Sequence, residues 1–458
     1  MKRLLWAATA LLAQILTSPL NAQQVRTTAE KLDEYLTSAQ QAYRFNGVAL
    51  VAHKGKVLLH KAYGVRNAVT KAPNDTSTRF PILSITKSFT SALILKLQEE
   101  DKLSVDDNLS QYFPDYPNGD KIKLHHLLTH TSGIFNYTDM IDEGDSAIVC
   151  HPVPKQRVLE LFWDKPLEFR PGKQYAYNNS AYFLLGMIIE KVTGKSYEQA
   201  MRDMIFQPLG MTQSGFDFIN LPAQSRAFGY DTLTTDYFSP YPHYDSTVAY
   251  SAGAIYSTTS DMYKWGRAVA NQQLLSAKSW KQAFTPRLNQ YGYGWFIDKT
   301  NGKEYVRHDG GYPGFMSTFV YYPKEDLTIV LLNNFGNYGE SLVPLMIAIS
   351  GIVFGEPYDL WQPRQYMKLE TKALSQYVGS YALNDKYKID LVLKNDGLYA
   401  QGKGKTQFSE LPLYASGEDR FFFGTYNTRF TFERNEAGKV VKFTLREHGQ
   451  DTEWKKLN

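Results

Sequence analysis

A serine and a lysine three residues apart, Ser84 and Lys87, are the first candidates for chemistry in this chain. Residues at positions i and i+3 of a helix share one face, one turn apart. A helix N-terminus adds unpaired N–H groups and positive potential beside the serine. This combination makes a hydroxyl nucleophilic, provided that the lysine can lose its proton. The alternative interpretation is that both residues merely begin an amphipathic helix within residues 80–99.

Two later stretches contain residues that suit the same chemistry. Tyr177 and Asn179 precede a helix predicted over residues 180–193, and alternate side chains of an extended loop point the same way. His308, Gly310 and Gly311 fall between two predicted strands, where glycines let a substrate backbone approach closely. Taken singly, Tyr177 could be a half-buried aromatic residue, Asn179 a helix cap and His308 a structural histidine.

Taken together, these stretches resemble a known family. Ser84-Ile-Thr-Lys87, Tyr177-Asn-Asn179 and His308-Asp-Gly310 match, in order and spacing, the three motifs of the penicillin-recognising serine hydrolases. The similar branch contains the class C β-lactamases, D-alanyl-D-alanine carboxypeptidases, D-aminopeptidases and related esterases. The resemblance spans about residues 45–335 and includes supporting segments such as residues 127–133 and 169–172.

The resemblance implies a mechanism. Ser84 attacks a carbonyl group and forms an acyl-enzyme that water later releases. Either Lys87 or Tyr177 is the base, and both need a pKa shifted below the ordinary value of about 10 to act as one near neutral pH. Asn179 is expected to bind Lys87 or a substrate amide. The backbone N–H groups of Ser84 and Gly311 are expected to form the oxyanion hole.

The third motif departs from the class C pattern, because His308 stands where those β-lactamases carry lysine. A histidine with a pKa of about 6.5 is only partly charged at neutral pH, so it is a weak partner for a substrate carboxylate. Arg307 could supply charge, but on a strand its side chain should point to the opposite face. Strong β-lactamase activity is therefore not expected.

The chain is expected to contain an export signal and two domains. Residues 1–22 have a basic start (Lys2 and Arg3), an apolar stretch and the small residue Ala22 before an expected cleavage site. No later run is long and apolar enough to anchor the product stably in a membrane, so a periplasmic or secreted protein is predicted. Residues 23–355 should form the hydrolase domain, 356–371 a linker and 372–458 a small antiparallel β domain.

The predicted fold class is α+β. A hairpin near residues 47–63 should join strands near 293–297, 304–307, 316–322 and 327–332 in one antiparallel sheet. Helices predicted over residues 25–44, 124–134, 154–163, 180–193 and 343–353 should flank it. The C-terminal domain should be a barrel or sandwich. Residues 136–153 start acidic and look loop-like, while residues 216–248 show little periodicity and are predicted to be a surface excursion over a cleft. Both segments are expected to select the substrate side chain.

Composition excludes several other classes of protein. The net charge is only +4 and no run of Lys or Arg suggests nucleic acid as a partner. Cys150 is the sole cysteine, so neither an internal disulfide nor a cysteine-rich metal site is possible. Helical spacing would put His126 and His130 on one face, but no carboxylate accompanies them. We therefore predict neither a metal nor a cofactor.

The leading hypothesis is an exported serine hydrolase that cleaves a small ester, amide or peptide, with D-amino-acid-containing and cell-wall-derived substrates included. One alternative is a β-lactamase or D-alanyl-D-alanine carboxypeptidase. The other is a non-catalytic protein that binds cell-wall polymers on the same scaffold, although such a binder would not need Lys87 and Tyr177 together.

Overall fold

The computed structural model describes residues 26–142, 150–241, 245–336, 341–406, 408, 410–424 and 426–457. Its larger part is built on a six-stranded antiparallel sheet in the order β2-β1-β12-β11-β10-β9. The strands are β1 (Gly47–His53), β2 (Lys56–Tyr63), β9 (Phe296–Thr300), β10 (Lys303–Tyr312), β11 (Phe315–Tyr322) and β12 (Leu327–Asn333). The N-terminal hairpin thus joins strands from the other end of the domain, which confirms the predicted sheet.

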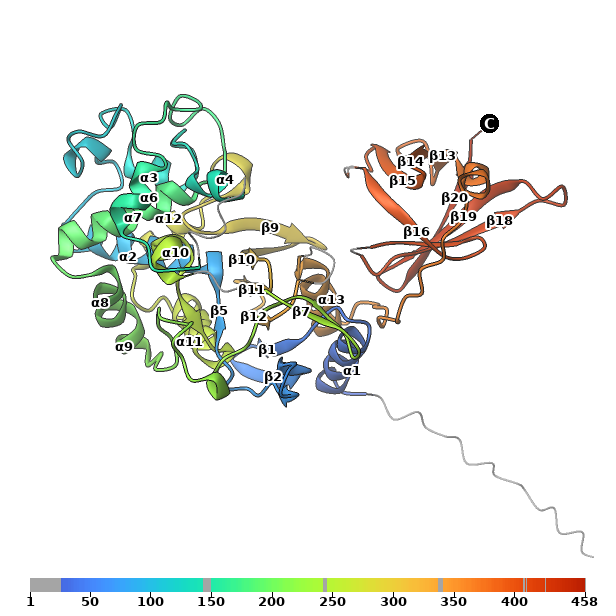
Figure 1. Ribbon diagram of the computed structural model, residues 1–458, viewed down its shortest axis with the longest axis horizontal. Helices are drawn as coiled ribbons and strands as arrows, with labels where there is room; N and C mark the ends of the chain where they lie inside the picture. The colour runs from blue at the N-terminus through green and yellow to red at the C-terminus, as the bar shows by residue number, and fades with distance from the viewer. Residues whose placement is uncertain are drawn as a thin grey trace, which may run out of the picture.

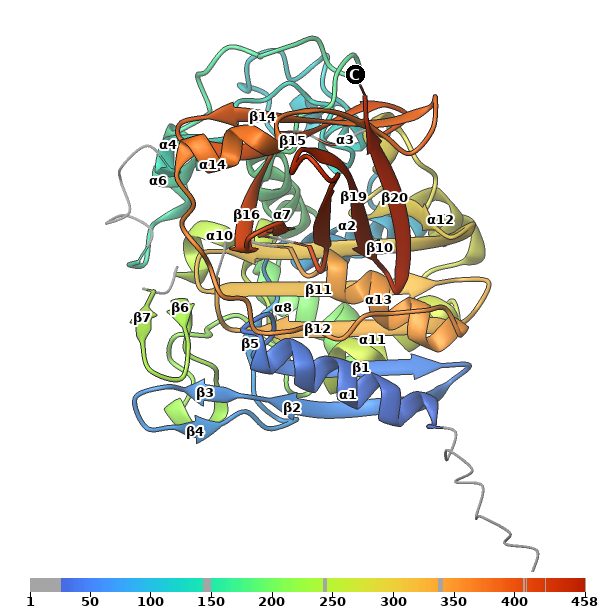
Figure 2. The same ribbon diagram turned by 90° about the vertical axis from the view of Figure 1, so that its right-hand side faces the viewer.

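Burial explains which strands occupy the middle of the sheet. Every residue of β12, and every residue of β11 except Met316, is buried, so both faces of these strands are covered. One face packs against α1 (Thr28–Gln41) and α13 (Val343–Phe354), as Figure 2 shows with both helices in front of the strands. The other face supports the active site.

The active-site face is covered by helices from the middle of the chain (Figure 1). The α-helices there are α2 (Thr86–Glu99), α3 (Leu124–Leu128), α4 (Tyr137–Asp142), α6 (Lys155–Glu160), α7 (Asn179–Thr193), α8 (Tyr197–Met201), α9 (Gln207–Leu209), α10 (Ser246–Gly253), α11 (Thr259–Ala270) and α12 (Ala277–Ala283). Short 3₁₀ or π turns are η1 (Leu83–Ile85), η2 (Leu109–Gln111), η3 (Arg202–Phe206), η4 (Ala223–Ser225) and η5 (Leu288–Gln290).

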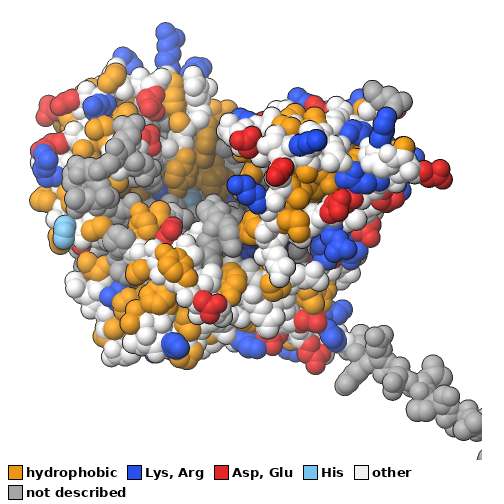
Figure 3. All heavy atoms as spheres, turned by 45° about the vertical axis from the view of Figure 1, so that its right-hand side comes forward, with side chains coloured by type: hydrophobic (Ala, Val, Ile, Leu, Met, Phe, Trp, Pro, Cys, Tyr) orange, Lys and Arg blue, Asp and Glu red, His pale blue; other side chains and the backbone are white. Residues whose placement is uncertain are grey.

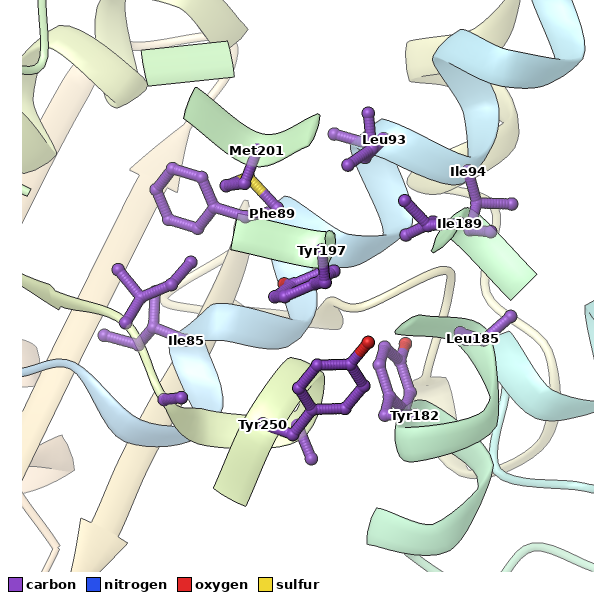
Figure 4. Close-up of a cluster of buried hydrophobic side chains, with 14 of the residues drawn as sticks. Ile85, Phe89, Leu93, Ile94, Tyr182, Leu185, Ile189, Tyr197, Met201 and Tyr250 are labelled. Carbon is purple, nitrogen blue, oxygen red and sulfur yellow. The ribbon is translucent and has the colours of Figure 1, made fainter. Parts of the chain in front are cut away.

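Packing of α2 against α7 and α10 forms the centre of this layer. Figure 4 shows Phe89 and Leu93 of α2 among side chains from neighbouring helices, including Tyr197 and Tyr250. Phe89 is fully buried and stacks on Trp265 at 4.1 Å between ring centroids. A fully buried aromatic side chain of this kind contributes several kcal/mol to stability, about 3–5 by truncation to alanine.

One helix prediction and one loop prediction need correction. The helix predicted over residues 124–134 ends at Leu128, because His130 has a left-handed backbone with φ of 56°. His126 and His130 therefore do not share a helical face. The segment 216–248 is not wholly irregular, since it contains β6 (Tyr230–Leu233) and β7 (Phe238–Pro240) and runs into α10. Part of the predicted segment 136–153 lies outside the described residues.

Three pairs of short strands complete the larger part. The remaining strands are β3 (Val65–Asn67), β4 (Ala72–Pro73), β5 (Phe80–Pro81) and β8 (Tyr256–Ser257). The pairs are β3 with β4, β5 with β8, and β6 with β7. The β5–β8 pair joins the chain just before η1 to the chain just after α10, so it aligns two walls of the active site.

The C-terminal part is a closed eight-stranded barrel, one of the two predicted architectures. After α14 (Thr371–Leu374) and η6 (Ser375–Tyr377) come β13 (Gly379–Ala382), β14 (Tyr387–Lys394), β15 (Gly397–Gly404), β16 (Leu411–Gly417), β17 (Arg420–Phe423), β18 (Arg429–Arg434), β19 (Val440–Glu447) and β20 (Gln450–Lys456). The β13–β20 pairing closes the barrel, so no strand edge is left open.

Specific contacts attach the segment before the barrel to both parts. The Trp361 indole donates to the Tyr35 hydroxyl of α1 at 2.9 Å, and its backbone N–H donates to Ser38 Oγ at 3.0 Å. Two residues earlier, Asp359 accepts from Arg446 of β19 at 2.8 Å. The predicted domain boundaries and the predicted signal over residues 1–22 stay predictions. Among the residues that the structure describes, no helix combines the length and apolarity needed to cross a bilayer.

Candidate active site

Ser84 lies in the η1 turn directly before α2, rather than in the α-helix itself. The residue before it, Leu83, has a left-handed backbone with φ of 52°, which is unfavourable for a side chain of this size. The turn is held against the sheet by Ser317, whose hydroxyl donates to the Ile82 carbonyl at 2.7 Å. The local strain is thus maintained by tertiary contacts, as is common where a side chain must be aimed.

A glycine is needed at position 310 because the η1 turn lies close against β10. A Cβ atom at Gly310 would lie 2.4 Å from the Ile82 carbonyl oxygen and 2.8 Å from the Leu83 Cβ. A Cβ at Gly311, by contrast, would meet nothing within 4 Å. Of the two predicted glycines, Gly310 therefore lets the nucleophile's turn pack on the strand, while Gly311 leaves open space above it.

Lys87 is fully buried and its ammonium or amine nitrogen is surrounded by three oxygens. Nζ lies 3.0 Å from Ser84 Oγ, 2.7 Å from Asn179 Oδ1 and 2.8 Å from the Ala252 carbonyl oxygen. The amide and carbonyl oxygens can only accept hydrogen bonds. In the neutral amine, two N–H groups satisfy these acceptors and the lone pair is left facing the Ser84 hydroxyl.

Burial also favours the neutral form of Lys87. Removal from water lowers the pKa of Lys87 well below its usual value, and the described surroundings place no carboxylate among its hydrogen-bond partners to oppose this. A neutral lysine touching a serine hydroxyl is the requirement for nucleophile activation set out from the sequence.

The orientation of Asn179 is fixed by its own neighbours. Its Nδ2 donates to Thr138 Oγ1 at 3.1 Å, which turns Oδ1 toward Lys87. Its backbone N–H donates to Asn136 Oδ1 at 2.9 Å. The helix cap of α7 is Asn178, whose side chain accepts from the Ala181 N–H, so the capping role considered for Asn179 belongs to the preceding residue.

Tyr177 covers Lys87 from the other side. Nζ lies 4.8 Å from the centre of the Tyr177 ring, and the Tyr177 side chain is half-buried. Desolvation raises the pKa of Tyr177 well above its usual value, while a hydrogen bond with Ser84 acts in the opposite direction. The resting pair is therefore a neutral amine and a neutral phenol.

His308 is neutral in this site rather than partly charged. Its Nδ1 lies 2.7 Å from the Asp309 carbonyl oxygen, which can only accept, so Nδ1 carries the proton. Its Nε2 lies 2.9 Å from the Tyr291 hydroxyl and accepts from it. Burial, with Lys87 and Arg307 nearby, lowers the pKa of His308 well below its usual value.

Arg307 does not supply the missing positive charge. Its guanidinium forms an ion pair with Asp309 and lies 5.1 Å from the centre of the Phe296 ring. Both of these partners line the wider cleft, whereas Arg307 itself is not among the described lining residues. Neither hollow at Ser84 has a lysine or arginine among its described lining residues.

Two hollows meet at Ser84. A cleft of about 760 Å³ extends past Tyr177, His308 and the glycine pair toward Met316 and Leu342. A smaller pocket of about 300 Å³ lies on the other side and is mostly apolar, with Ile141, Val248 and Ala249 in its wall. Figure 3 shows a hollow between the larger part and the barrel, with hydrophobic side chains along its walls. The nucleophile can thus be reached from two directions.

Comparison with known proteins now settles the family. Residues 32–344 match the Beta-lactamase family and residues 364–456 match a domain of unknown function, DUF3471. The chain belongs to the beta-lactamase family. The predicted resemblance is confirmed, and the protein is a serine hydrolase of this family.

The relatives include penicillin-binding proteins. Penicillin-binding protein 4* of Bacillus subtilis is 30% identical over 438 residues, covering 90% of this chain and 95% of its own length. A solved penicillin-binding protein from Bacillus halodurans is 29% identical, covers 71% of this chain and 99% of its own, and superimposes with a TM-score of 0.62. A D-amino acid amidase from Ochrobactrum anthropi, 21% identical, shares the fold with a TM-score of 0.63, covering 72% of this chain and 99% of its own.

Three residues of this beta-lactamase-family site were missed by sequence reasoning. The Ala252 carbonyl holds Lys87, and Tyr291 holds His308. Neither role is marked by residue type. His130, which lies in the supporting segment 127–133 and was also weighed as a metal ligand, packs on Tyr177 with 4.2 Å between ring centroids.

The remaining sequence candidates lie apart from the site. His125 and His126 contact each other at 4.3 Å between ring centroids, and His130 is buried under Tyr177 instead of beside them. Within the described residues, no group of three His, Cys, Asp or Glu side chains could hold a metal ion. Cys150 is half-buried and His151 is exposed.

Proposed function

We propose that this protein is an exported hydrolase that forms an acyl-enzyme on Ser84 with small esters or amides that lack a carboxylate, including amides of D-amino acids. The observation that carries the proposal is the position of the buried Lys87 Nζ, 3.0 Å from Ser84 Oγ. Its two other contacts are the Asn179 amide oxygen and the Ala252 carbonyl oxygen, which can only accept hydrogen bonds. This arrangement leaves the lysine lone pair for the serine proton.

The proposed reaction has two balanced steps. The Ser84 proton passes to the Lys87 amine as Oγ attacks the substrate carbonyl, with the backbone N–H groups of Ser84 and Gly311 facing the developing oxyanion. Tyr177 gives its phenol proton to the leaving group and is reprotonated from Lys87. In the second step the protons move in the opposite direction. Tyr177 returns a proton to Lys87 and takes one from water as the water oxygen attacks the acyl carbonyl. Lys87 then gives its proton to Ser84 Oγ, which releases the acid and restores the Ser84 hydroxyl.

The lining of the two hollows supports substrates without a carboxylate. His308 is neutral, Arg307 and Asp309 are paired with each other, and Asp231 also lines the wider cleft. A substrate carboxylate, as in a penicillin or a terminal D-alanine, would therefore find no available cation among the described lining residues. The apolar pocket beside Asn179 suits an aliphatic or aromatic acyl group.

One substrate panel tests this proposal. A fluorophosphonate probe should label the wild type and leave Ser84→Ala unlabelled. Among short esters, D-amino acid amides, D-Ala-D-Ala peptides and a chromogenic cephalosporin, the first two classes should be turned over fastest. No labelling of folded wild type would refute the proposed acyl-enzyme, and fast cephalosporin hydrolysis would refute the proposed preference.

Export is the second element of the proposal, and it rests on the basic start, apolar stretch and small residue within residues 1–22. In a host that processes such signals, the product outside the cytoplasm should begin near Gln23. N-terminal sequencing measures this directly. A product that retains residues 1–22 in the cytoplasm would contradict export.

The barrel carries a feature that favours a second, binding function. A hollow of about 260 Å³ is lined by Arg364, Arg420 and Arg429, and none of its described lining residues is acidic. Arg364 donates to the Gly424 carbonyl, and Arg429 lies 3.9 Å from Asp359. The Arg420 guanidinium is the one in this lining without a hydrogen-bond or ion-pair partner among the described residues. Tyr366 and Tyr414 beside it are 48% and 39% exposed and both contact Phe422 of the lining. Guanidinium groups pair with carboxylates and phosphates, so we propose that the barrel binds an anionic polysaccharide.

Binding of labelled polygalacturonate to the full chain tests this barrel function, with dextran as the neutral polymer. Arg420→Gln should weaken polygalacturonate binding several-fold without changing ester turnover. Lys439→Gln removes the same charge from another side of the barrel and should leave binding unchanged. Equal effects of both substitutions, or equal binding of dextran, would contradict a specific anionic site.

A further inference from the structure

The turn that ends α3 is paired with the loop that carries Tyr177. The Ala176 N–H donates to the His130 carbonyl at 3.0 Å, and the Gly172 N–H donates to the Thr131 carbonyl at 2.8 Å. His130 has a left-handed backbone, which directs its carbonyl and its ring toward the same loop. The loop before α7 therefore takes its course from this turn.

The His130 ring makes the next contact along that loop. Its Nδ1 accepts the backbone N–H of Asn178 at 3.0 Å. One residue thus accepts hydrogen bonds from both sides of Tyr177, at Ala176 through its carbonyl and at Asn178 through its ring. The ring also packs on the Tyr177 phenol ring, with centroids 4.2 Å apart and planes at 39°.

We propose that His130 is a positioning residue that fixes the Tyr177 phenol for proton transfer at Ser84. The inference rests on the proposed acyl-enzyme function and deepens it. Any shift of the Tyr177 backbone requires the hydrogen bonds at Ala176 or Asn178 to break, and the tilted imidazole packed at 4.2 Å blocks one face of the phenol ring. The phenol is held over Lys87 without any direct contact between His130 and substrate.

The protonation state of His130 follows from the same contacts. Because a backbone N–H donates to Nδ1, the proton of the neutral ring is on Nε2. Nε2 is buried and has no hydrogen-bond partner in the described part of the chain. A second proton could be placed only on Nδ1, where it would displace the Asn178 N–H.

No titratable group packed around His130 favours that second proton. Burial, with the two basic side chains of Lys87 and His308 nearby, lowers the pKa of His130 well below its usual value. The other facing groups are neutral phenols, from the loop, α7 and the turn before β9: Tyr175, Tyr177, Tyr182 and Tyr291. His130 therefore stays a hydrogen-bond acceptor at Nδ1 over the working pH range.

Two substitutions separate the acceptor from the rest of the side chain. In His130→Asn, the amide oxygen takes the place of Nδ1, and asparagine tolerates the left-handed backbone. In His130→Gln, the oxygen takes the place of Nε2 and cannot reach Asn178. We expect Asn to retain turnover within about 10-fold of wild type and Gln to lose about 10²-fold, in kcat rather than KM.

The leaving group distinguishes positioning from general damage. A p-nitrophenyl ester needs little protonation of its leaving group, whereas an ethyl ester of the same acid needs a proton from Tyr177. Both His130→Gln and Tyr177→Phe should therefore slow the ethyl ester much more than the p-nitrophenyl ester. In the double variant the two effects should not add, because they act on one group.

A spectroscopic measurement checks the inference without activity. The ¹⁵N resonances of labelled histidine should show His130 protonated only at Nε2 from pH 5.5 to 9. A charged ring, equal losses in Asn and Gln, or additive effects with Tyr177→Phe would each overturn the proposal. If the wild type fails to form an acyl-enzyme, the proposed function is overturned instead. The protonation state of the His130 ring can still be measured in that case.

Discussion

The floor of the active site and the interior of the barrel are both buried, but they are made of different side chains. On α2, the consecutive residues from Thr86 to Ser88, and then Thr90 and Ser91, are polar and fully buried. The buried side chains that pack together inside the barrel are all apolar or aromatic, and Phe443 contacts Phe430 at 5.2 Å and Phe432 at 5.3 Å between ring centroids.

Each buried polar group on the floor has an assigned partner. Thr90 donates to the Ser251 carbonyl at 2.7 Å, and Ser91 and Tyr182 share a hydrogen bond of 3.1 Å. Such groups gain little net stability, because their bonds mainly replace bonds to water. They instead fix the distance between α2 and α10, and with it the distance from Lys87 to Ala252.

The barrel interior has the opposite character. Aromatic burial contributes large, non-directional stabilisation and tolerates small shifts of any one ring. We infer that substitutions in the floor act mainly on catalysis and that substitutions in the barrel act mainly on stability. The predictions below challenge that contrast, beginning with the largest expected effect.

Lys87→Met should lower kcat/KM for the best ester by at least about 10⁴-fold, because the base is removed while the volume is kept. The free energy of unfolding should change by no more than about 3 kcal/mol, since the lost hydrogen bonds are offset by burying an apolar group. Lys96→Met on the same helix, where the lysine is partly exposed, is the matched control and should retain full activity. Activity in Lys87→Met within 10-fold of wild type would end the assignment of Lys87 as base.

Phe443→Ala in the barrel should cost about 3–5 kcal/mol, because its ring is fully buried against four aromatic neighbours. Ester turnover at temperatures where the barrel remains folded should stay at the wild-type level. Phe89→Ala on α2 is the matched variant, with similar burial, and should lose both stability and turnover. Thermal unfolding and ester kinetics on both variants measure the contrast, which fails if Phe443→Ala lowers turnover as much as Phe89→Ala.

Gly310→Ala should reduce turnover by about 10²–10³-fold, the scale of a misplaced oxyanion donor. The added Cβ would meet the Ile82 carbonyl at 2.4 Å, so η1 must move away from β10. Gly311→Ala is the control within the same motif, because its Cβ meets no protein atom within 4 Å. We expect the Gly311 variant to raise KM for bulky substrates and to retain its melting temperature, whereas Gly310→Ala should lower both kcat and stability.

Much of this contrast could be predicted from the sequence. The motifs could be identified from the spacing of Ser84 and Lys87 and from the order of the Tyr177 and His308 segments. Residue types and their spacing along the chain are enough to recognise such motifs. The alternating pattern of the sheet strands and the turn-rich C-terminal segment predicted the two folds for the same reason.

The contacts that tune the site could not be predicted in this way. The Ala252 carbonyl that holds Lys87 is 165 residues away and any residue could supply it. The left-handed backbones of Leu83 and His130 are imposed by tertiary packing against local preference. His130 was placed on a helix because the leucine-rich segment before it favours one, and the true turn became visible only through its partners at Ala176 and Asn178.

The smallest predicted effect, taken per pH unit, is a pH dependence of stability that comes from Lys87 alone. Its pKa is lowered by burial in the folded state and is about 10.4 in the unfolded state. Between those two values the unfolded chain binds a proton that the folded chain does not, so stability rises with pH across that window. The slope is at most about 1.4 kcal/mol per pH unit.

Measurement between pH 7 and 10 avoids the buried histidines His130 and His308, whose ordinary pKa of about 6.5 confines their contribution to lower pH. Urea unfolding gives the free energy of unfolding of wild type and of Lys87→Met at each pH. The difference between the two proteins belongs to Lys87, because the contributions of the other titratable groups are the same in both. Parallel curves for the two proteins would mean that Lys87 is charged when folded, and the neutral-amine assignment would then be wrong.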